Sequence, residues 1–262
     1  MPELPDVETF RRYIDNNALH KKISKVQVEN KKVLSKITES ELIEALSGRK
    51  MEKTTRHGKH LMIELDNKSW MMMHFGMTGS LKYYKDDPGL SLVRILFSFD
   101  NGYHLAYIDQ RLFGRISLND SPEEYIKQHE LGPDLLSLKE DDFVDILSKH
   151  NGGIKSVLMD QSVIAGLGND YSDEILYHAG IHPNTKLPAL SNEEFHELYK
   201  ITMRVINVAI DNEANPEKMP DDYLLPHRKK GEPCPKCGGT VSKIYVNGRT
   251  TYFCSECQKV KG

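Results

Sequence analysis

Short runs of alternating or consecutive apolar residues fill the first half of the chain, and this pattern is typical of β-strands. Strands are predicted at 23–28, 60–65, 69–75, 80–84, 92–99 and 103–109. Asn101-Gly102 joins the last two as a tight hairpin, and a short helix is expected from about Pro5 to Asn16. Residues 1 to about 130 therefore predict an antiparallel β-sandwich or barrel with a flanking N-terminal helix.

In the second half the spacing of the apolar residues changes to that of helices. Helices are predicted at 141–150, 154–160, 170–180 and 191–210. Ser191 and Glu194 form a capping box at the start of the last one. The turn residues Gly132 and Pro133 indicate a linker at 129–138. The fold class expected is α+β, with a strand-rich part followed by a helical part.

The amino-acid composition is that of a soluble, folded protein. Its 262 residues are 39% apolar and 28% charged, which suits two domains. No apolar run approaches the roughly 18 residues of a membrane span, and the first residues are charged and unlike a signal peptide. We therefore expect a cytoplasmic protein without a membrane partner. The net charge of -3 gives no overall indication of nucleic acid.

Positive charge is concentrated at the C-terminal end. Residues 226–262 contain eight Lys or Arg and two Glu, about +6, which leaves about -9 for the rest of the chain. All four cysteines lie in this segment, in two C-x-x-C pairs: Cys234, Cys237, Cys254 and Cys257. Four thiolates close a tetrahedral zinc site and leave no position open for chemistry. A disulfide or redox pair is less favoured, because cytoplasmic thiols stay reduced.

Two further local patterns carry candidate chemistry in the basic segment and in the helical part. Asn247-Gly248 favours a type I′ turn between the two cysteine pairs, so the segment predicts a zinc-stabilised β-hairpin with Arg249 just past its tip. Residues 165–170, AGLGND, precede a predicted helix. Free amides and the helix dipole favour a phosphate there, although an ordinary glycine turn is the alternative.

The chain begins MPELPDVE. If Met1 is removed, Pro2 becomes a free secondary amine, and an α-amino group titrates at roughly 7.7–8.0, so part of it is nucleophilic at cellular pH. Glu3 beside it can move protons, so the pair is equipped to form a Schiff base at a sugar or carbonyl carbon. A proline that merely begins a helix is the alternative.

Together these segments resemble the formamidopyrimidine-DNA glycosylase family, which shares its fold with the endonuclease VIII group. MPELPDVE resembles the catalytic N-terminus of the family, IAGLGNDYSDEILYHAGIHP its helix-two-turns-helix signature, and the cysteine hairpin with Gly248-Arg249 its zinc finger. Leu4 favours the formamidopyrimidine branch. The resemblance implies a catalytic N-terminal β-sandwich domain at 1–132, a helix-two-turns-helix DNA-binding domain at 133–226 and a zinc finger at 227–262.

The resemblance also implies an activity: a bifunctional DNA glycosylase and AP lyase of base excision repair that acts on a nucleotide flipped out of the duplex. Pro2 would attack C1′ to form the Schiff base, and Glu3 would move protons during ring opening and β/δ-elimination. Lys59, in RHGKHL, would contact a phosphate and assist the elimination. One structural Zn2+ and no catalytic metal are expected, with damaged double-stranded DNA as the partner of a monomer at the nucleoid.

Further DNA contacts follow from the same resemblance. Met77, Arg111 and Phe113 would fill the space left by the flipped nucleotide, with Arg111 donating to the orphaned base. Asn169 and Arg249 would hold phosphates, and Lys155 matches a family lysine near the active site. Without the resemblance, Met77 and Phe113 would be interpreted as core residues and Lys59 as a solvated strand end.

The chain departs from the family pattern in three places. Asp6 replaces a glutamate, Asp170 stands where isoleucine is common, and the segment 210–231 is shorter and more acidic than the loop that covers an everted purine. Formamidopyrimidines are therefore expected ahead of 8-oxoguanine, with oxidised pyrimidines and abasic sites as alternatives. A damage-recognition protein with weak or lost glycosylase activity is the alternative function, and a zinc-ribbon protein unrelated to repair is a more remote one.

Overall fold

The computed structural model describes residues 1–86 and 88–261, so that only positions 87 and 262 of the predicted domain ranges lie outside it. The chain divides into two compact units, Met1–Glu130 and the part from Leu131 onward. The division falls inside the predicted linker. No helix of the described residues is long and apolar enough to cross a membrane.

The first unit is an antiparallel β-sandwich, as predicted. Its two sheets have the strand orders β1-β6-β7-β5 and β2-β3-β4-β8, and every neighbouring pair is antiparallel. In chain order its elements are α1 (Leu4–Asn17), β1 (Ile23–Val28), α2 (Glu39–Leu46), β2 (Met51–His57), β3 (His60–Leu65), β4 (Trp70–His74), β5 (Gly79–Tyr84), β6 (Val93–Phe99), β7 (His104–Asp109), β8 (Arg115–Asn119) and α3 (Pro122–Gln128).

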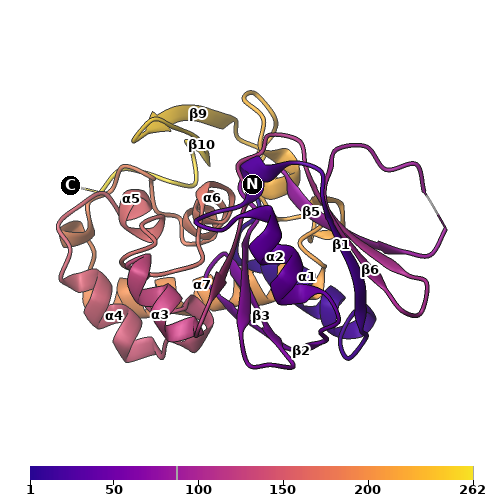
Figure 1. The fold of residues 1–262 in the computed structure, drawn as a ribbon. Helices are drawn as coiled ribbons and strands as arrows, with labels where there is room; N and C mark the ends of the chain where they lie inside the picture. Colours follow the sequence, from indigo (N-terminus) through magenta and orange to yellow (C-terminus); the bar gives the residue numbers. More distant parts are fainter. Residues whose placement is uncertain (87, 262) are drawn as a thin grey trace. The chain divides into compact units, whose positions relative to one another are not determined.

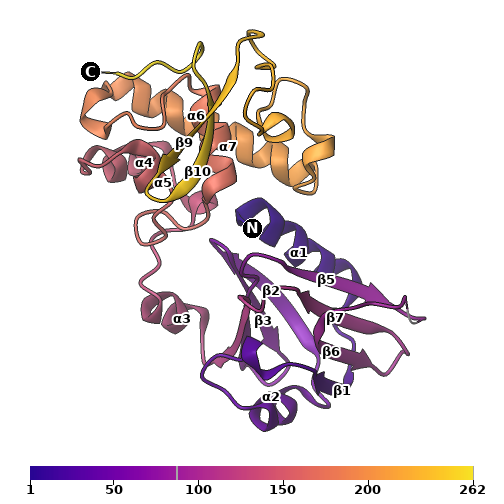
Figure 2. The same ribbon diagram turned by 90° about the horizontal axis from the view of Figure 1, so that it is seen from above.

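Apolar side chains from both sheets form one core. Ile63 and Met71 from one sheet, and Ile95 and Phe97 from the other, are fully buried in the same cluster as Val7 of α1. Helix α1 contacts β2 and β3 of one sheet and β5 of the other, and therefore spans the two sheets (Figure 2). This packing holds the N-terminal residues against the sandwich.

The second unit combines helices with the cysteine hairpin. Its longer elements are α4 (Glu140–Ser148), α5 (Ile154–Leu158), α6 (Asn169–His178), α7 (Asn192–Asp211), β9 (Val241–Val246) and β10 (Arg249–Cys254). Helix α7 packs against α4 and α6, and β10 packs against α6, as Figure 1 shows. The unit therefore holds the helical part and the hairpin in one body.

Local signals in the second unit are confirmed by backbone geometry. Ser191 caps α7, and its side chain accepts a hydrogen bond from the backbone N–H of Glu194 while that glutamate bonds back to Ser191. Asn247 and Gly248 have φ values of 46° and 73°, so both occupy the left-handed region that a type I′ turn requires. The turn joins β9 and β10 in the predicted antiparallel hairpin.

Candidate functional site

The predicted catalytic residues Pro2 and Glu3 stand at the start of α1. Glu3 is the N-cap residue and is only 1% exposed, whereas Pro2 is partly exposed. The backbone N–H of Glu3 donates to Oδ2 of Asp6 at 2.9 Å. The shorter acid at position 6 thus reaches the cap, and it fixes Glu3 at the helix end.

A chain of polar contacts connects α1 with the turn that carries Lys59. Arg56 of β2 lies 3.5 Å from the carboxylate of Glu8 on α1, and its Nη1 donates to the carbonyl of Gly58 at 2.9 Å. Burial acts to raise the pKa of Glu8, but hydrogen bonds from Arg11 and Arg12 and the charge of Arg56 bring it below its ordinary value. Through Arg56, these contacts connect the turn that carries Lys59 to helix α1.

Lys59 itself is buried, with 7% of its surface exposed. It occupies the turn between β2 and β3, where Gly58 has a φ of 55° in the left-handed region. The interpretation of Lys59 as a solvated strand end is therefore not what the structure shows. Lys59 therefore presents an ammonium from a tight turn whose backbone is held by Arg56.

Met77, Arg111 and Phe113 lie on two adjacent loops of the first unit. A Cβ added to Gly76 would stand 2.4 Å from the carbonyl carbon of Phe113, so only a glycine permits this approach of the two backbones. Phe113 is 48% exposed, and the guanidinium of Arg111 lies 4.9 Å from the centre of its ring. Phe113 is therefore a surface side chain and not a core residue.

Asp109 organises both loops, and sequence reasoning did not single it out. Its carboxylate is fully buried and accepts hydrogen bonds from the hydroxyl of Thr78 at 2.5 Å and from the backbone N–H groups of Arg111 and Gly114 at 3.2 and 2.8 Å. Thr78 follows Met77, so one carboxylate fixes the start and the end of the pair of loops. The available signal was an acid at the last position of a predicted strand, where the segment DQRLFG begins.

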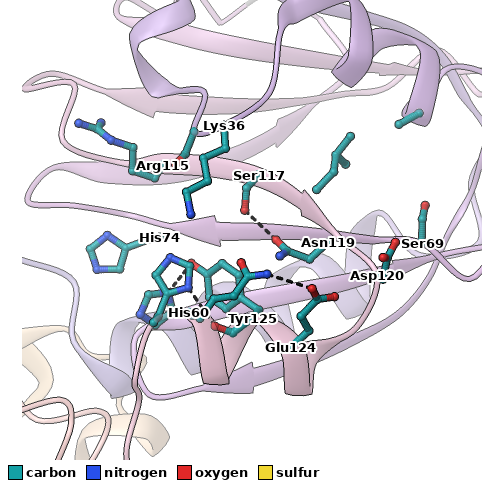
Figure 3. Close-up of a pocket in the computed structure, with 15 residues that line it drawn as sticks. Lys36, His60, Ser69, His74, Arg115, Ser117, Asn119, Asp120, Glu124 and Tyr125 are labelled. Atoms are coloured by element: carbon teal, nitrogen blue, oxygen red, sulfur yellow. Dashed lines mark hydrogen bonds between the residues drawn. The ribbon is translucent and has the colours of Figure 1, made fainter.

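A cavity of about 500 Å3 lies in the first unit, on the side of β8 that faces α3. Figure 3 shows Lys36 and Arg115 at one end, and Asp120 and Glu124 at the other. Burial and the charges of Lys59 and Arg115 lower the pKa of His74 to about 4. His74 is therefore neutral at pH 7, and Lys59 acts on this end of the cavity. Sequence reasoning did not identify His74.

His74→Asn is expected to reduce the loss of stability at acid pH. Asn keeps an acceptor for the backbone N–H of Gly76, which bonds Nδ1 of His74 at 3.3 Å, but does not titrate. Because the folded-state pKa of about 4 lies below the ordinary 6.5, the unfolded chain binds the proton first. The stability that His74 contributes is complete above pH 6.5 and is lost toward pH 4, by roughly 3 kcal/mol at most.

Thermal unfolding at pH 7.5 and pH 5 checks this prediction. The midpoint should fall less for His74→Asn than for the unchanged protein, because at pH 5 His74 is protonated in the unfolded chain but largely neutral in the folded one, which favours unfolding. Equal falls for the two proteins would show that His74 does not carry the effect.

In the second unit the four cysteines converge as the spacing predicts. Their sulfur atoms all lie within 4.8 Å of one another, with Cys234 and Cys257 at 3.8 Å and Cys237 and Cys254 at 3.6 Å. Four thiolates about 2.3 Å from one tetrahedral zinc would lie about 3.8 Å apart, so the geometry fits this ion. The hydroxyl of Tyr177 on α6 lies 3.3 Å from Sγ of Cys234. The four cysteines form a structural zinc site.

Lys155 and Asn169 meet in a buried network. Nζ of Lys155 donates to Asn169 at 2.9 Å, to Asp173 at 2.5 Å and to the hydroxyl of Thr251 at 2.6 Å, and the lysine is fully buried. Its three protons therefore have acceptors within the protein. This placement does not favour a direct contact between Lys155 and DNA. It favours a role in holding Asn169.

Asn169 opens α6 and is also tied to the hairpin. Its Nδ2 donates to the carbonyl of Thr250 at 2.9 Å, one residue after Arg249. At the hairpin tip Nδ2 of Asn247 donates to the hydroxyl of Ser156 at 2.6 Å, while Arg249 is exposed. The start of α6 and the arginine of the hairpin are thus linked within one rigid set of contacts.

Three protein-family models match this chain, one in each of the three segments described above. The model described as Formamidopyrimidine-DNA glycosylase N-terminal domain matches residues 1–116, that described as Formamidopyrimidine-DNA glycosylase H2TH domain matches 131–220, and that described as Zinc finger found in FPG and IleRS matches 231–260.

Relatives with that name align along their whole length. The formamidopyrimidine-DNA glycosylase of Pelotomaculum thermopropionicum is 35% identical and that of Bacillus subtilis 34% identical, each over 100% of this chain and 100% of the relative. The structure of the Lactococcus lactis protein, a G226P mutant in complex with Fapy-dG containing DNA, superposes with a TM-score of 0.89 at 28% identity, covering 98% of this chain and 100% of that one. The chain thus belongs to the formamidopyrimidine-DNA glycosylase family, as a DNA glycosylase of base excision repair with the AP lyase activity typical of that family.

Proposed function

We propose that the chain removes ring-opened formamidopyrimidines in preference to 8-oxoguanine. Pro2 is the nucleophile in this proposal, Glu3 transfers protons, and Lys59 contacts a phosphate. The observation that most supports these catalytic roles is the placement of Glu3: a carboxylate 1% exposed, fixed as the cap of α1 and adjacent in the chain to the proline. The order of substrates rests on the shorter, more acidic segment 210–231. Oxidised pyrimidines and abasic sites are the further substrates to compare.

The proposed reaction requires Pro2 to be the first residue, because a retained Met1 makes its nitrogen a tertiary amide. The amine attacks C1′ as the bond to the damaged base breaks, and the base leaves with a proton. The sugar ring opens to a Schiff base, and Glu3 moves the protons of this step. Loss of the C2′ proton expels the 3′ phosphate, and a second elimination expels the 5′ phosphate. Lys59 compensates phosphate charge during elimination.

The remaining residues would bind the duplex. Met77 and Phe113 suit the unstacked base faces, and Arg111 suits the orphaned base. Asn169 and Arg249 would bind phosphates. For Lys155 we propose a supporting role, because its ammonium donates to Asn169, Asp173 and Thr251 and the residue has no exposed surface. We further propose a monomer that acts on DNA at the nucleoid in the cytoplasm.

Borohydride reduction in the presence of duplex DNA with one abasic site tests the function. A Schiff base at Pro2 would be reduced to a stable covalent adduct, visible as a shifted band on a denaturing gel. We expect the adduct for the processed protein and its loss for a variant that retains an added residue before Pro2. Absence of any adduct in zinc-loaded protein of correct N-terminus would contradict the chemistry and favour a DNA-binding protein with lost activity.

A further inference from the structure

Two of the unusual sequence features, Asp170 and the end of the segment 210–231, meet in the structure. Arg228 bonds the carboxylate of Asp170 through Nη1, and its Nη2 donates to Asp173 at 2.8 Å. Its guanidinium carbon also lies 5.3 Å from the ring centre of Tyr252 in β10. One arginine therefore contacts the first turn of α6 and the zinc hairpin together.

The acids of α6 act as anchors for the segment that precedes the zinc site. Glu174 accepts the backbone N–H groups of Leu224 and Leu225 at 2.9 and 2.6 Å. Asp170, Asp173 and Glu174 have the spacing i, i+3 and i+4, which places them on neighbouring positions of one helix face. This face therefore fixes residues 224–228 by three carboxylates.

The charges at the start of α6 balance. Asp170 is 37% exposed at its side chain, and Asp173 is fully buried. Arg228 and Lys155 supply two positive charges to these two carboxylates. Asn169, the proposed phosphate contact, directly precedes Asp170 and accepts a hydrogen bond from Lys155, so an uncompensated carboxylate in this cluster would repel a phosphate bound at Asn169.

We propose that Arg228 is a positioning residue for DNA binding, which neutralises Asp170 and Asp173 and fixes the start of α6 to the zinc hairpin, without itself touching the phosphate. The proposal rests on the proposed phosphate contacts of Asn169 and Arg249. It also gives Asp170 a function: the acid that stands where isoleucine is common is the partner of this arginine. The planar fork of Arg228 bridges two carboxylates, which a lysine ammonium cannot do in the same way.

The test measures binding of a duplex with an uncleavable abasic-site analogue by fluorescence anisotropy. Arg228→Met should raise the Kd about tenfold at 100 mM salt, because one carboxylate becomes uncompensated beside the phosphate. The double variant Arg228→Met with Asp170→Asn should return the Kd to within about threefold of the starting protein, since the unpaired acid is then absent. Lys229, the next residue, pairs with Glu232 and is highly exposed, so Lys229→Met is the matched control for loss of one positive charge.

The outcomes separate positioning from other roles. If Arg228 bound phosphate directly, adding Asp170→Asn to Arg228→Met would improve binding by no more than the roughly threefold that Asp170→Asn gives alone, and this result would overturn the proposal. Binding by Arg228→Met that equals that of Lys229→Met would overturn it as well. The rate of adduct formation at saturating protein should change by less than about twofold, because the chemistry resides in the other unit. Failure of the proposed function itself would instead abolish the adduct in every protein.

Zinc content and the melting temperature are measured for each variant. If Arg228→Met does not retain zinc, Asp170→Asn and Arg228→Lys decide the question. Asp170→Asn leaves Arg228 paired with Asp173 and should bind DNA as tightly as the starting protein or up to about threefold more tightly. Arg228→Lys should bind more weakly than the starting protein. Weaker binding by Asp170→Asn, or unchanged binding by Arg228→Lys, would overturn the proposal.

Discussion

Glu3→Gln is expected to reduce base excision by about 10²- to 10⁴-fold, the usual contribution of a general acid or base. Glutamine has nearly the size of glutamate and keeps an acceptor at the helix start, but it cannot take up or release a proton at neutral pH. Glu3 is buried as the cap of α1, so little solvent is available to replace it as a proton carrier. The variant should nevertheless form the borohydride adduct with DNA that already has an abasic site, because the amine of Pro2 is unchanged.

The loss of base excision is measured by single-turnover release of a formamidopyrimidine base. The retained ability to form a Schiff base is measured by borohydride trapping on abasic DNA. Asp6→Asn is the matched control, because Asp6 accepts the backbone N–H of Glu3 and belongs to the same cap. A weakened cap costs about 1 kcal/mol of stability and should leave excision within a few-fold of its starting rate. Equal losses in the two variants would mean that Glu3 acts through the fold of α1, and rapid excision by Glu3→Gln would assign proton transfer to another group.

Much of the first unit follows from local pattern, and the exceptions have a physical reason. The six strands predicted from apolar runs are present, whereas β2 and β8 were not predicted. Their sequences, MEKTTRH and RISLN, are short or mainly polar and have few buried positions. β8 is stabilised by pairing with β4, about 45 positions earlier in the chain, and such distant pairing does not show in a local pattern. β2 pairs with β3 across a two-residue turn, but its mainly polar sequence lacks the apolar run on which the prediction relied.

The candidate site also contains residues that local sequence patterns indicate and residues that they do not. Asn247-Gly248 and the cysteine pairs are local signals, and the turn and the sulfur cluster agree with them. Lys155 could be matched to a family lysine, but its burial depends on Thr251, 96 positions away in the chain. Arg228 has no local signal of its own, since its carboxylate partners lie on α6, and the local pattern around Asp109 does not show its bond to Thr78 in the other loop. Residues that position others are therefore the ones that sequence reasoning misses.

Removal of zinc is expected to weaken DNA binding by more than about 100-fold, because the ion's binding energy is part of the folding energy of the hairpin. Cys234 and Cys254 share a buried cluster with Tyr177 of α6 and Leu224. When β10 separates, Asn169 loses the carbonyl of Thr250 and Lys155 loses the hydroxyl of Thr251. The buried ion pair of Lys155 and Asp173 is then short of hydrogen bonds, which is strongly destabilising.

DNA binding is measured at several salt concentrations for protein treated with a chelator and for Cys254→Ser. Both should show this loss of affinity, and added zinc should restore the affinity of the chelated protein but not that of the variant. Arg249→Ala is the variant that isolates the hairpin arginine: Arg249 is exposed, so zinc content should be unchanged. It should lower the slope of log affinity against log salt by about 1, the value for one lost phosphate contact. Zinc removal should lower that slope by at least the same amount, because it displaces Arg249 together with Asn169. A zinc-free protein that binds DNA with the original slope would show that the hairpin does not bind phosphate.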